Sequence, residues 1–143
     1  MKGIDPLLSH GILLLLGMVT MSLLIVSISI SLSRTERNLV SVELSFIADS
    51  IKNKIIETYS LANQSSNYTT GLFQLNLPER IGNRRYSVTL SQNNLLVNTS
   101  IGNEPIEIAR SLPIDAELSG SLTMPIFIKV DKKDGQIKIG LIR

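Results

Sequence analysis

One long apolar run dominates the first part of the chain. Residues 6–33 contain no Lys, Arg, Asp or Glu, and residues 12–32 read ILLLLGMVTMSLLIVSISISL. About 20 apolar helical residues cross the hydrocarbon core of a bilayer, and backbone polar groups in lipid must pair within their own segment. A chain of 143 residues has no core large enough to surround such a helix. The run therefore predicts a helix that is inserted in a membrane.

The run does not fit a cleaved secretory signal. Such a signal has an apolar core of about 7–15 residues, followed by a small-residue cleavage site. This run is longer, and no Ala-x-Ala pattern follows it. We therefore expect no cleavage after the run.

The pattern changes after Ser33, but nothing breaks the helix there. No Pro or Gly occurs between Met18 and Ala62, and apolar residues recur at intervals of three or four, which is the spacing of one helical face. This stripe comprises Val40, Leu44, Ile47, Ile51 and Ile55. We predict one helix from near Pro6 to near Tyr59, apolar all round in its first half and amphipathic in its second. The stripe is expected to pack on one face of a sheet.

Residues 60–143 read as a loop followed by strands. Residues 60–70, SLANQSSNYTT, favour a loop because Ser, Asn and Thr side chains bond to nearby backbone. Short apolar segments between turn residues then predict strands, at residues 72–77, 86–91, 95–99, 106–108, 119–124, 126–130 and 137–141. The charged residues 131–135 predict a hairpin turn between the last two. The expected fold is α+β: a long N-terminal membrane or filament-core helix followed by a small antiparallel β-sandwich or barrel domain over residues 60–143.

The composition argues against an enzyme and against a nucleic-acid-binding protein. The net charge of +2 is small, and the basic residues are scattered without interleaved aromatics. The sequence has no Cys, and its single His is His10, so the familiar zinc sites and His-based triads are excluded. The carboxylate pairs Glu104/Glu107 and Asp115/Glu117 lack any supporting motif, and there is no glycine-rich phosphate loop. We expect no catalytic residue, no metal site, no cofactor and no nucleic-acid partner.

Small residues within the apolar run suggest contacts with other helices. Gly17 offers a flat backbone surface in mid-helix, and Thr20 lies on the adjacent face. Small residues let membrane helices approach one another closely. We predict that Gly17 and Thr20 form a helix-packing face; the alternative is that lipid simply tolerates Gly17.

Two signals disagree on the side of the membrane that the β-domain occupies. Three sequons match the N-glycosylation pattern of secreted surface loops, with acceptors Asn63, Asn67 and Asn98. Lys2 alone precedes the run, whereas Arg34 and Arg37 follow it, and positive residues favour the cytoplasm. We place the domain outside because the N-terminus carries a more specific signal.

That signal lies in residues 1–8, MKGIDPLL. They resemble the class III signal peptide of archaeal type IV pilins, in which a short basic leader ends in a small residue before the hydrophobic segment. Many of those pilins begin their mature chain with an aliphatic residue, a small polar residue, Pro and two aliphatic residues, as residues 4–8 do here. The resemblance implies a leader over residues 1–3, cleavage by a prepilin peptidase after Lys2 and Gly3, and a mature helix over residues 4–59 that begins at Ile4. Leu8 stands where bacterial pilins carry a Glu.

A second segment is similar to one found in the same subunits. Residues 77–86, LPERIGNRRY, have a Leu-Pro turn, a Gly turn and a strand led by Tyr86. The resemblance implies a structural subunit of an archaeal type IV pilus-like filament for adhesion or surface attachment. Its partners would be copies of itself, with an assembly ATPase and a membrane platform that extract it from the membrane. It would be a single-pass membrane protein first and part of an extracellular filament afterwards. The alternatives are an archaellum accessory or stator subunit that binds the S-layer, and a membrane-tethered binding module.

Overall fold

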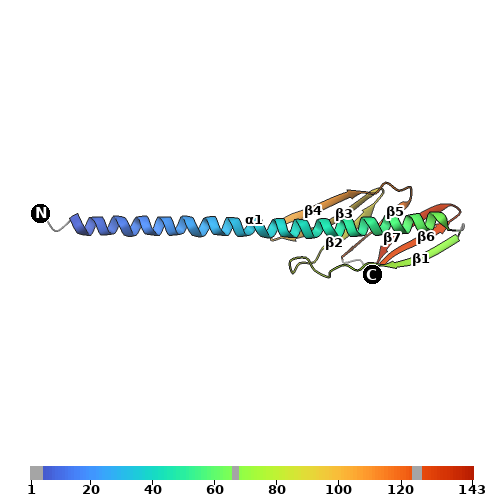
Figure 1. Ribbon diagram of the computed structural model, residues 1–143, viewed down its shortest axis with the longest axis horizontal. Coiled ribbons are helices and arrows are strands. Elements are labelled where there is room, and N and C mark those ends of the chain that lie inside the picture. Colours follow the sequence, from blue (N-terminus) through green and yellow to red (C-terminus); the bar gives the residue numbers. More distant parts are fainter. Residues whose placement is uncertain (1–4, 66–67, 124–126) are drawn as a thin grey trace. The chain divides into compact units, whose positions relative to one another are not determined.

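The computed structural model of the chain describes residues 5–65, 68–123 and 127–143 (Figure 1). One helix, α1 (Asp5–Gln64), precedes seven strands. The strands are β1 (Tyr68–Gln74), β2 (Ser87–Ser91), β3 (Asn94–Ile101), β4 (Glu104–Ser111), β5 (Glu117–Thr123), β6 (Phe127–Lys133) and β7 (Gln136–Ile142). The α+β class is confirmed, since a long N-terminal helix is followed by a mostly antiparallel sheet. The chain divides into two compact units, Met1–Asn38 and Leu39–Arg143.

The first unit consists of the N-terminal part of α1. All its side chains from residue 9 to residue 38 are exposed, and the large apolar ones between residues 12 and 32 are 48% to 67% exposed. Hydroxyl groups bond back to carbonyls one turn earlier, as Ser22 does to Met18 at 2.8 Å and Ser29 does to Ile25 at 2.9 Å. The helix is long and apolar enough to cross a membrane.

In the second unit all seven strands belong to one sheet, in the order β1-β6-β7-β5-β2-β3-β4. Neighbouring strands are antiparallel except β5 and β7, which pair in parallel. The sheet is a single layer and not the expected sandwich or barrel. The reason is that α1, from Leu39 onward, covers the apolar face of the sheet. The helix thus provides the second layer that another sheet would have provided.

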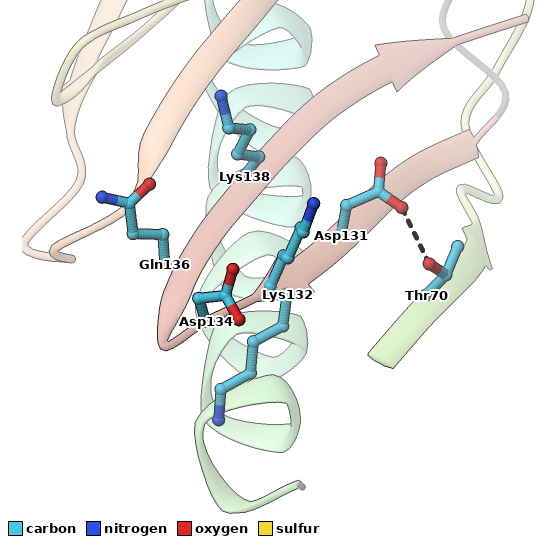
Figure 2. A pocket seen from close by; sticks show the side chains of 7 residues that line it. Thr70, Asp131, Lys132, Asp134, Gln136 and Lys138 are labelled. Carbon is cyan, nitrogen blue, oxygen red and sulfur yellow. Dashed lines mark hydrogen bonds between the residues drawn. The ribbon is translucent and has the colours of Figure 1, made fainter. Parts of the chain in front are cut away.

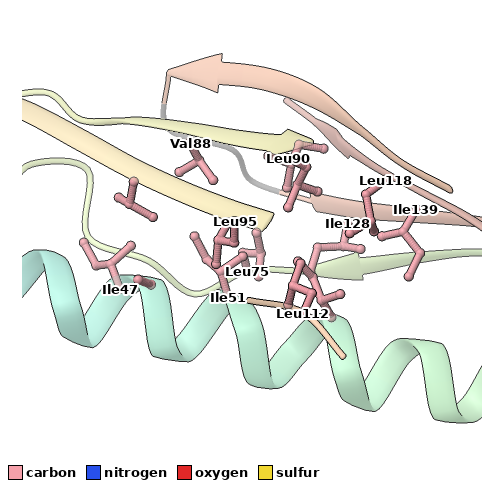
Figure 3. Packing of buried hydrophobic residues seen from close by; sticks show 14 of the residues in the cluster. Ile47, Ile51, Leu75, Val88, Leu90, Leu95, Leu112, Leu118, Ile128 and Ile139 are labelled. Carbon is pink, nitrogen blue, oxygen red and sulfur yellow. The ribbon is translucent and has the colours of Figure 1, made fainter. Parts of the chain in front are cut away.

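The core lies between this sheet face and α1 (Figure 3). All five residues of the predicted stripe are at most 2% exposed, which confirms the stripe. Side chains on the sheet alternate between its two faces, and the inward ones include Val88, Leu90, Leu95, Val97, Ile128, Val130, Ile137, Ile139 and Leu141. Full burial of each such side chain stabilises the fold by roughly 1.5–3 kcal/mol. Burial on one side is therefore what holds this part of α1 on the sheet.

The helix ends five residues later than predicted, at Gln64 and not near Tyr59, and β1 begins inside the predicted loop. Tertiary contacts account for the extension. Ala62 is buried in the core, and the Lys132 ammonium donates hydrogen bonds to the carbonyls of Ala62 at 2.9 Å and Ser65 at 3.1 Å. Carbonyls at the end of a helix have no partner within the helix, so a buried cation from β6 stabilises the last turn.

The hairpin between β6 and β7 has a shorter turn than predicted. Asp134 and Gly135 both have positive φ, 52° and 82°, which is the geometry of a two-residue mirror-image turn that fits the strand twist. As a result β6 continues to Lys133 and β7 begins at Gln136. Met124 and Ile126, the end of one predicted strand and the start of the next, lie outside the described residues.

Candidate functional site

The predicted helix-packing residues lie at a shallow hollow on the first unit. The hollow has a volume of about 470 Å³ and is lined by His10, Leu13, Leu14, Gly17, Met18 and Met21. A Cβ atom added to Gly17 would meet nothing within 4 Å. The missing side chain therefore forms the floor of the hollow, and flexible Met side chains lie at its side.

Thr20 lies next to this hollow and contacts Gly17 directly. Its hydroxyl donates to the carbonyls of Leu16 at 3.0 Å and Gly17 at 2.9 Å. The structure thus brings the two predicted packing residues together. Because the hydroxyl is satisfied within the helix, Thr20 can face lipid or another helix without an unpaired polar group.

The other sequence-predicted sites do not come together in one place. Lys2, Gly3, Ile4 and Asn67 lie outside the described residues. Asn63 is exposed in the last turn of α1. Asn98 is half-buried in β3, where its side-chain oxygen accepts a hydrogen bond from the Ser87 hydroxyl. Of the sequons, the one at Asn63 is therefore the more accessible of the two that the structure describes.

Two long-range contacts have no signal in the sequence. One is the helix cap by Lys132, whose side chain is only 7% exposed. The alternation Ile128, Val130, Lys132 would have placed Lys132 on the inward face of its strand, but its partners, 67 to 70 residues away, left no signal.

The second contact joins the edge strand β4 to α1. The Arg110 guanidinium donates to both carboxylate oxygens of Asp49, at 2.7 and 3.2 Å, and to the Ser45 hydroxyl at 2.6 Å. The hydrogen bond from Arg110 holds the pKa of Asp49 below its usual range. Both side chains are partly exposed, so the pair orients β4 more than it stabilises the fold.

The segment between β1 and β2 is held by its own contacts. The buried Tyr86 hydroxyl donates to the carbonyl of Pro78 at 2.9 Å, and burial raises the pKa of that hydroxyl. Gly82 and Asn83 have positive φ, 51° and 64°, and form the turn between Ile81 and Arg84. These are the Pro, Gly and Tyr features of residues 77–86 that the sequence singled out.

A second hollow, of about 460 Å³, lies around the β6–β7 turn (Figure 2). We call this hollow and the turn the distal end of the second unit. It is lined by Thr70, Asp131, Lys132, Lys133, Asp134, Gln136 and Lys138. Lys129 at 2.8 Å and Thr70 at 2.9 Å contact Asp131 and lower its pKa, while Lys138 pairs with Glu117 at 2.6 Å. Opposite charges thus pair around this hollow. Over residues 5–65, 68–123 and 127–143, no group of three or more His, Asp or Glu residues is placed to hold a metal ion.

Comparison with known proteins adds no relative to these observations. No protein-family model matches the chain, and neither a curated protein nor a solved structure matches it.

Proposed function

We propose that this chain is a structural subunit of a surface filament of the archaeal type IV pilus kind, which serves adhesion or surface attachment. The observation that carries the proposal is the apolar surface of α1 in the first unit. Its large apolar side chains face outward on every side between residues 12 and 32. Leaving such side chains in water costs roughly 1.5–3 kcal/mol each, so the surface requires lipid or other apolar helices around it.

A filament core and a bilayer can both meet this requirement, at different times. In the membrane, α1 is a single-pass anchor. During assembly, copies of the same helix replace the lipid, and van der Waals packing drives the exchange because lipid tails are as apolar as Leu. The hollow at Gly17 supports this exchange, since a side chain from a neighbouring helix fits where Gly17 has none.

The second unit suits display on the outside of such a filament. Its core is closed by α1, and the middle of its outer sheet face carries small uncharged hydroxyl groups. Thr89 and Ser121 lie opposite each other on β2 and β5, and their hydroxyls are 2.9 Å apart. The role needs only a folded, hydrated domain and no catalytic group. The resemblance of residues 1–3 to a pilin leader implies three further partners. These are a prepilin peptidase, an assembly ATPase and a membrane platform.

The proposal is tested on filaments sheared from the surface of the native cells. Mass spectrometry of purified filaments is expected to find this chain, beginning at Ile4. A bulky residue at Gly3, such as Gly3→Phe, is expected to leave the precursor in the membrane, whereas Lys2→Arg keeps the leader basic and serves as the control.

Two outcomes would refute the proposal. Surface-exposed protein that still begins with Met1 would contradict leader processing. A chain that is present in the membrane but absent from every filament would favour the archaellum accessory subunit or the tethered binding module instead.

A further inference from the structure

The segment between β1 and β2, residues 75–86, lies at the end of the second unit where the helix enters. A Cβ atom added to Gly82 would be 3.2 Å from a methyl group of Val40, and Ile81 is buried. Val40 follows Ser33, the last residue of the uncharged run, by seven residues. Even a fully extended chain of that length spans only about 25 Å. Val40, next to Gly82, therefore lies within that distance of the end of the uncharged run.

The opposite end of the second unit is much farther along the helix. Lys132, close to the β6–β7 turn in sequence, donates a hydrogen bond to the carbonyl of Ala62, which lies 22 residues after Val40. At 1.5 Å per helical residue this separation is roughly 33 Å. The two ends of the unit can therefore be tested independently.

Positive charge is concentrated in and near the segment 75–86. Arg80, Arg84 and Arg85 accompany a single Glu79, and Arg34 and Arg37 accompany a single Glu36 at the end of the apolar run. These five arginines and two glutamates give a charge of +3, whereas the whole chain carries +2, so all other residues together carry −1.

Three arginines of the second unit surround a hollow of about 470 Å³. Arg80, Arg85 and Arg143 line it together with Glu79 and Tyr86. A guanidinium presents a planar fork of donors that matches phosphate oxygens. The distal hollow of Figure 2 differs, because its cations are lysines and carboxylates lie among them. Among the side chains that line the arginine-lined hollow, one is a carboxylate and three are cations.

We propose that this arginine-lined hollow binds the anionic headgroups of the bilayer in which α1 is inserted. The inference rests on the membrane insertion of the proposed function, but not on filament assembly or on the side of the membrane. Anionic lipids attract basic segments within a Debye length of the surface, which is about 8 Å at physiological ionic strength. The contact would hold the β-domain against the membrane until the helix leaves it.

The test uses the full chain in vesicles, and the absence of Cys allows a single label. Asn76 is exposed and lines the hollow, so Asn76→Cys carries an environment-sensitive fluorophore. Gln136→Cys, exposed at the distal end, carries the control label. Adding phosphatidylglycerol to phosphatidylcholine vesicles is expected to shift the Asn76 label to shorter wavelength, and high salt to reverse the shift. The Gln136 label is expected not to respond.

Charge variants separate the arginine-lined hollow from general attraction. Arg80→Gln with Arg85→Gln is expected to weaken the affinity of the chain's Asn76 region for phosphatidylglycerol-containing vesicles by roughly 25-fold, since each arginine near the surface contributes about fivefold to the affinity. Lys133→Gln with Lys138→Gln removes the same charge at the distal end and is expected to change nothing.

Several results would overturn the inference. The inference fails if the Asn76 label shows no lipid-dependent shift, or if the Gln136 label shifts as much as the Asn76 label. It also fails if the lysine double variant weakens the shift as much as the arginine double variant does. Inorganic phosphate that shifts the Asn76 label as strongly in phosphatidylcholine vesicles would show a site for free anions instead. Vesicle flotation separates the two proposals: a chain that floats without the shift refutes only the lipid contact, whereas a chain that does not float refutes membrane insertion as well.

Discussion

Helix α1 has apolar side chains along nearly its whole length, but its two parts meet different surroundings. Up to Asn38 every described side chain from residue 9 onward is exposed, whereas from Val40 to Ala62 one face is buried against the sheet. The same secondary structure thus serves two purposes. One part has its apolar partner in the sheet, whereas the described side chains of the other part are exposed.

The largest expected effect comes from the buried part. Ile51 is fully buried in the core, and Ile51→Ala is expected to lower the free energy of unfolding of the β-domain by about 2–5 kcal/mol, because it leaves a cavity. Ile25→Ala is the matched control, since Ile25 is 59% exposed. Urea titrations of the full chain in detergent micelles, followed by circular dichroism in the β-sheet band, measure both. Equal losses in the two variants would contradict the division between the two parts of α1.

A smaller effect is expected where the buried part of α1 ends. Lys132→Met keeps the length of the side chain but removes the hydrogen bonds to three carbonyls of residues 62–65. Hydrogen bonds to a charged group contribute about 1.5–3 kcal/mol, and the loss in the same titration is expected to be of that order. Lys133→Met, on the exposed neighbour, is expected to change stability by less than about 0.5 kcal/mol. A Lys132 variant as stable as the wild type would show that β6 does not cap the helix.

The buried stripe was predictable from the sequence because it repeats within a few turns of one helix. Its partner layer was not, because the order of strands in the sheet depends on contacts between distant segments. The end of α1 shows the same limit. Ser, Asn and Gln in residues 60–65 favour a loop locally, but burial of Ala62 and the cap by Lys132 outweigh that preference.

Two ion pairs in the second unit are expected to make the stability of the fold weakly dependent on pH. The pKa values of Asp49 and Asp131 are lowered in the folded state by Arg110 and by Lys129 with Thr70. In the unfolded chain the pKa of an Asp carboxyl is about 3.9. The stability that the two ion pairs contribute is therefore present above about pH 4, and it is lost as the pH falls through the lower pKa values of the folded state. Both carboxylates are partly exposed, so solvent keeps the effect small.

The measurement for this prediction is unfolding by urea at a series of pH values. Wild-type stability is expected to decline below about pH 4, and Asp49→Asn is expected to decline less steeply over the same range. An identical slope in the variant would show that the Asp49–Arg110 pair does not contribute to stability.

For the candidate site, the sequence could single out Gly17 and Thr20, because a small residue in an apolar helix is a local feature. It could not show that side chains from His10 to Met21 form a hollow around Gly17. The arginine-lined hollow escaped it altogether. Arg80 and Arg85 come together with Arg143 only because the sheet brings the segment between β1 and β2 close to the end of β7.

The central claim is that copies of this chain cover the exposed part of α1, and Gly17→Leu tests it most directly. The variant fills the hollow but keeps the surface apolar, so membrane insertion and the fold of the β-domain should be unchanged. Gly11→Leu makes the same change on a face about 120° away and serves as the control. Electron microscopy of cells that express each variant is expected to show filaments containing Gly11→Leu protein and none containing Gly17→Leu protein. Normal filaments of the Gly17→Leu protein would contradict the claim that this face packs against neighbouring subunits.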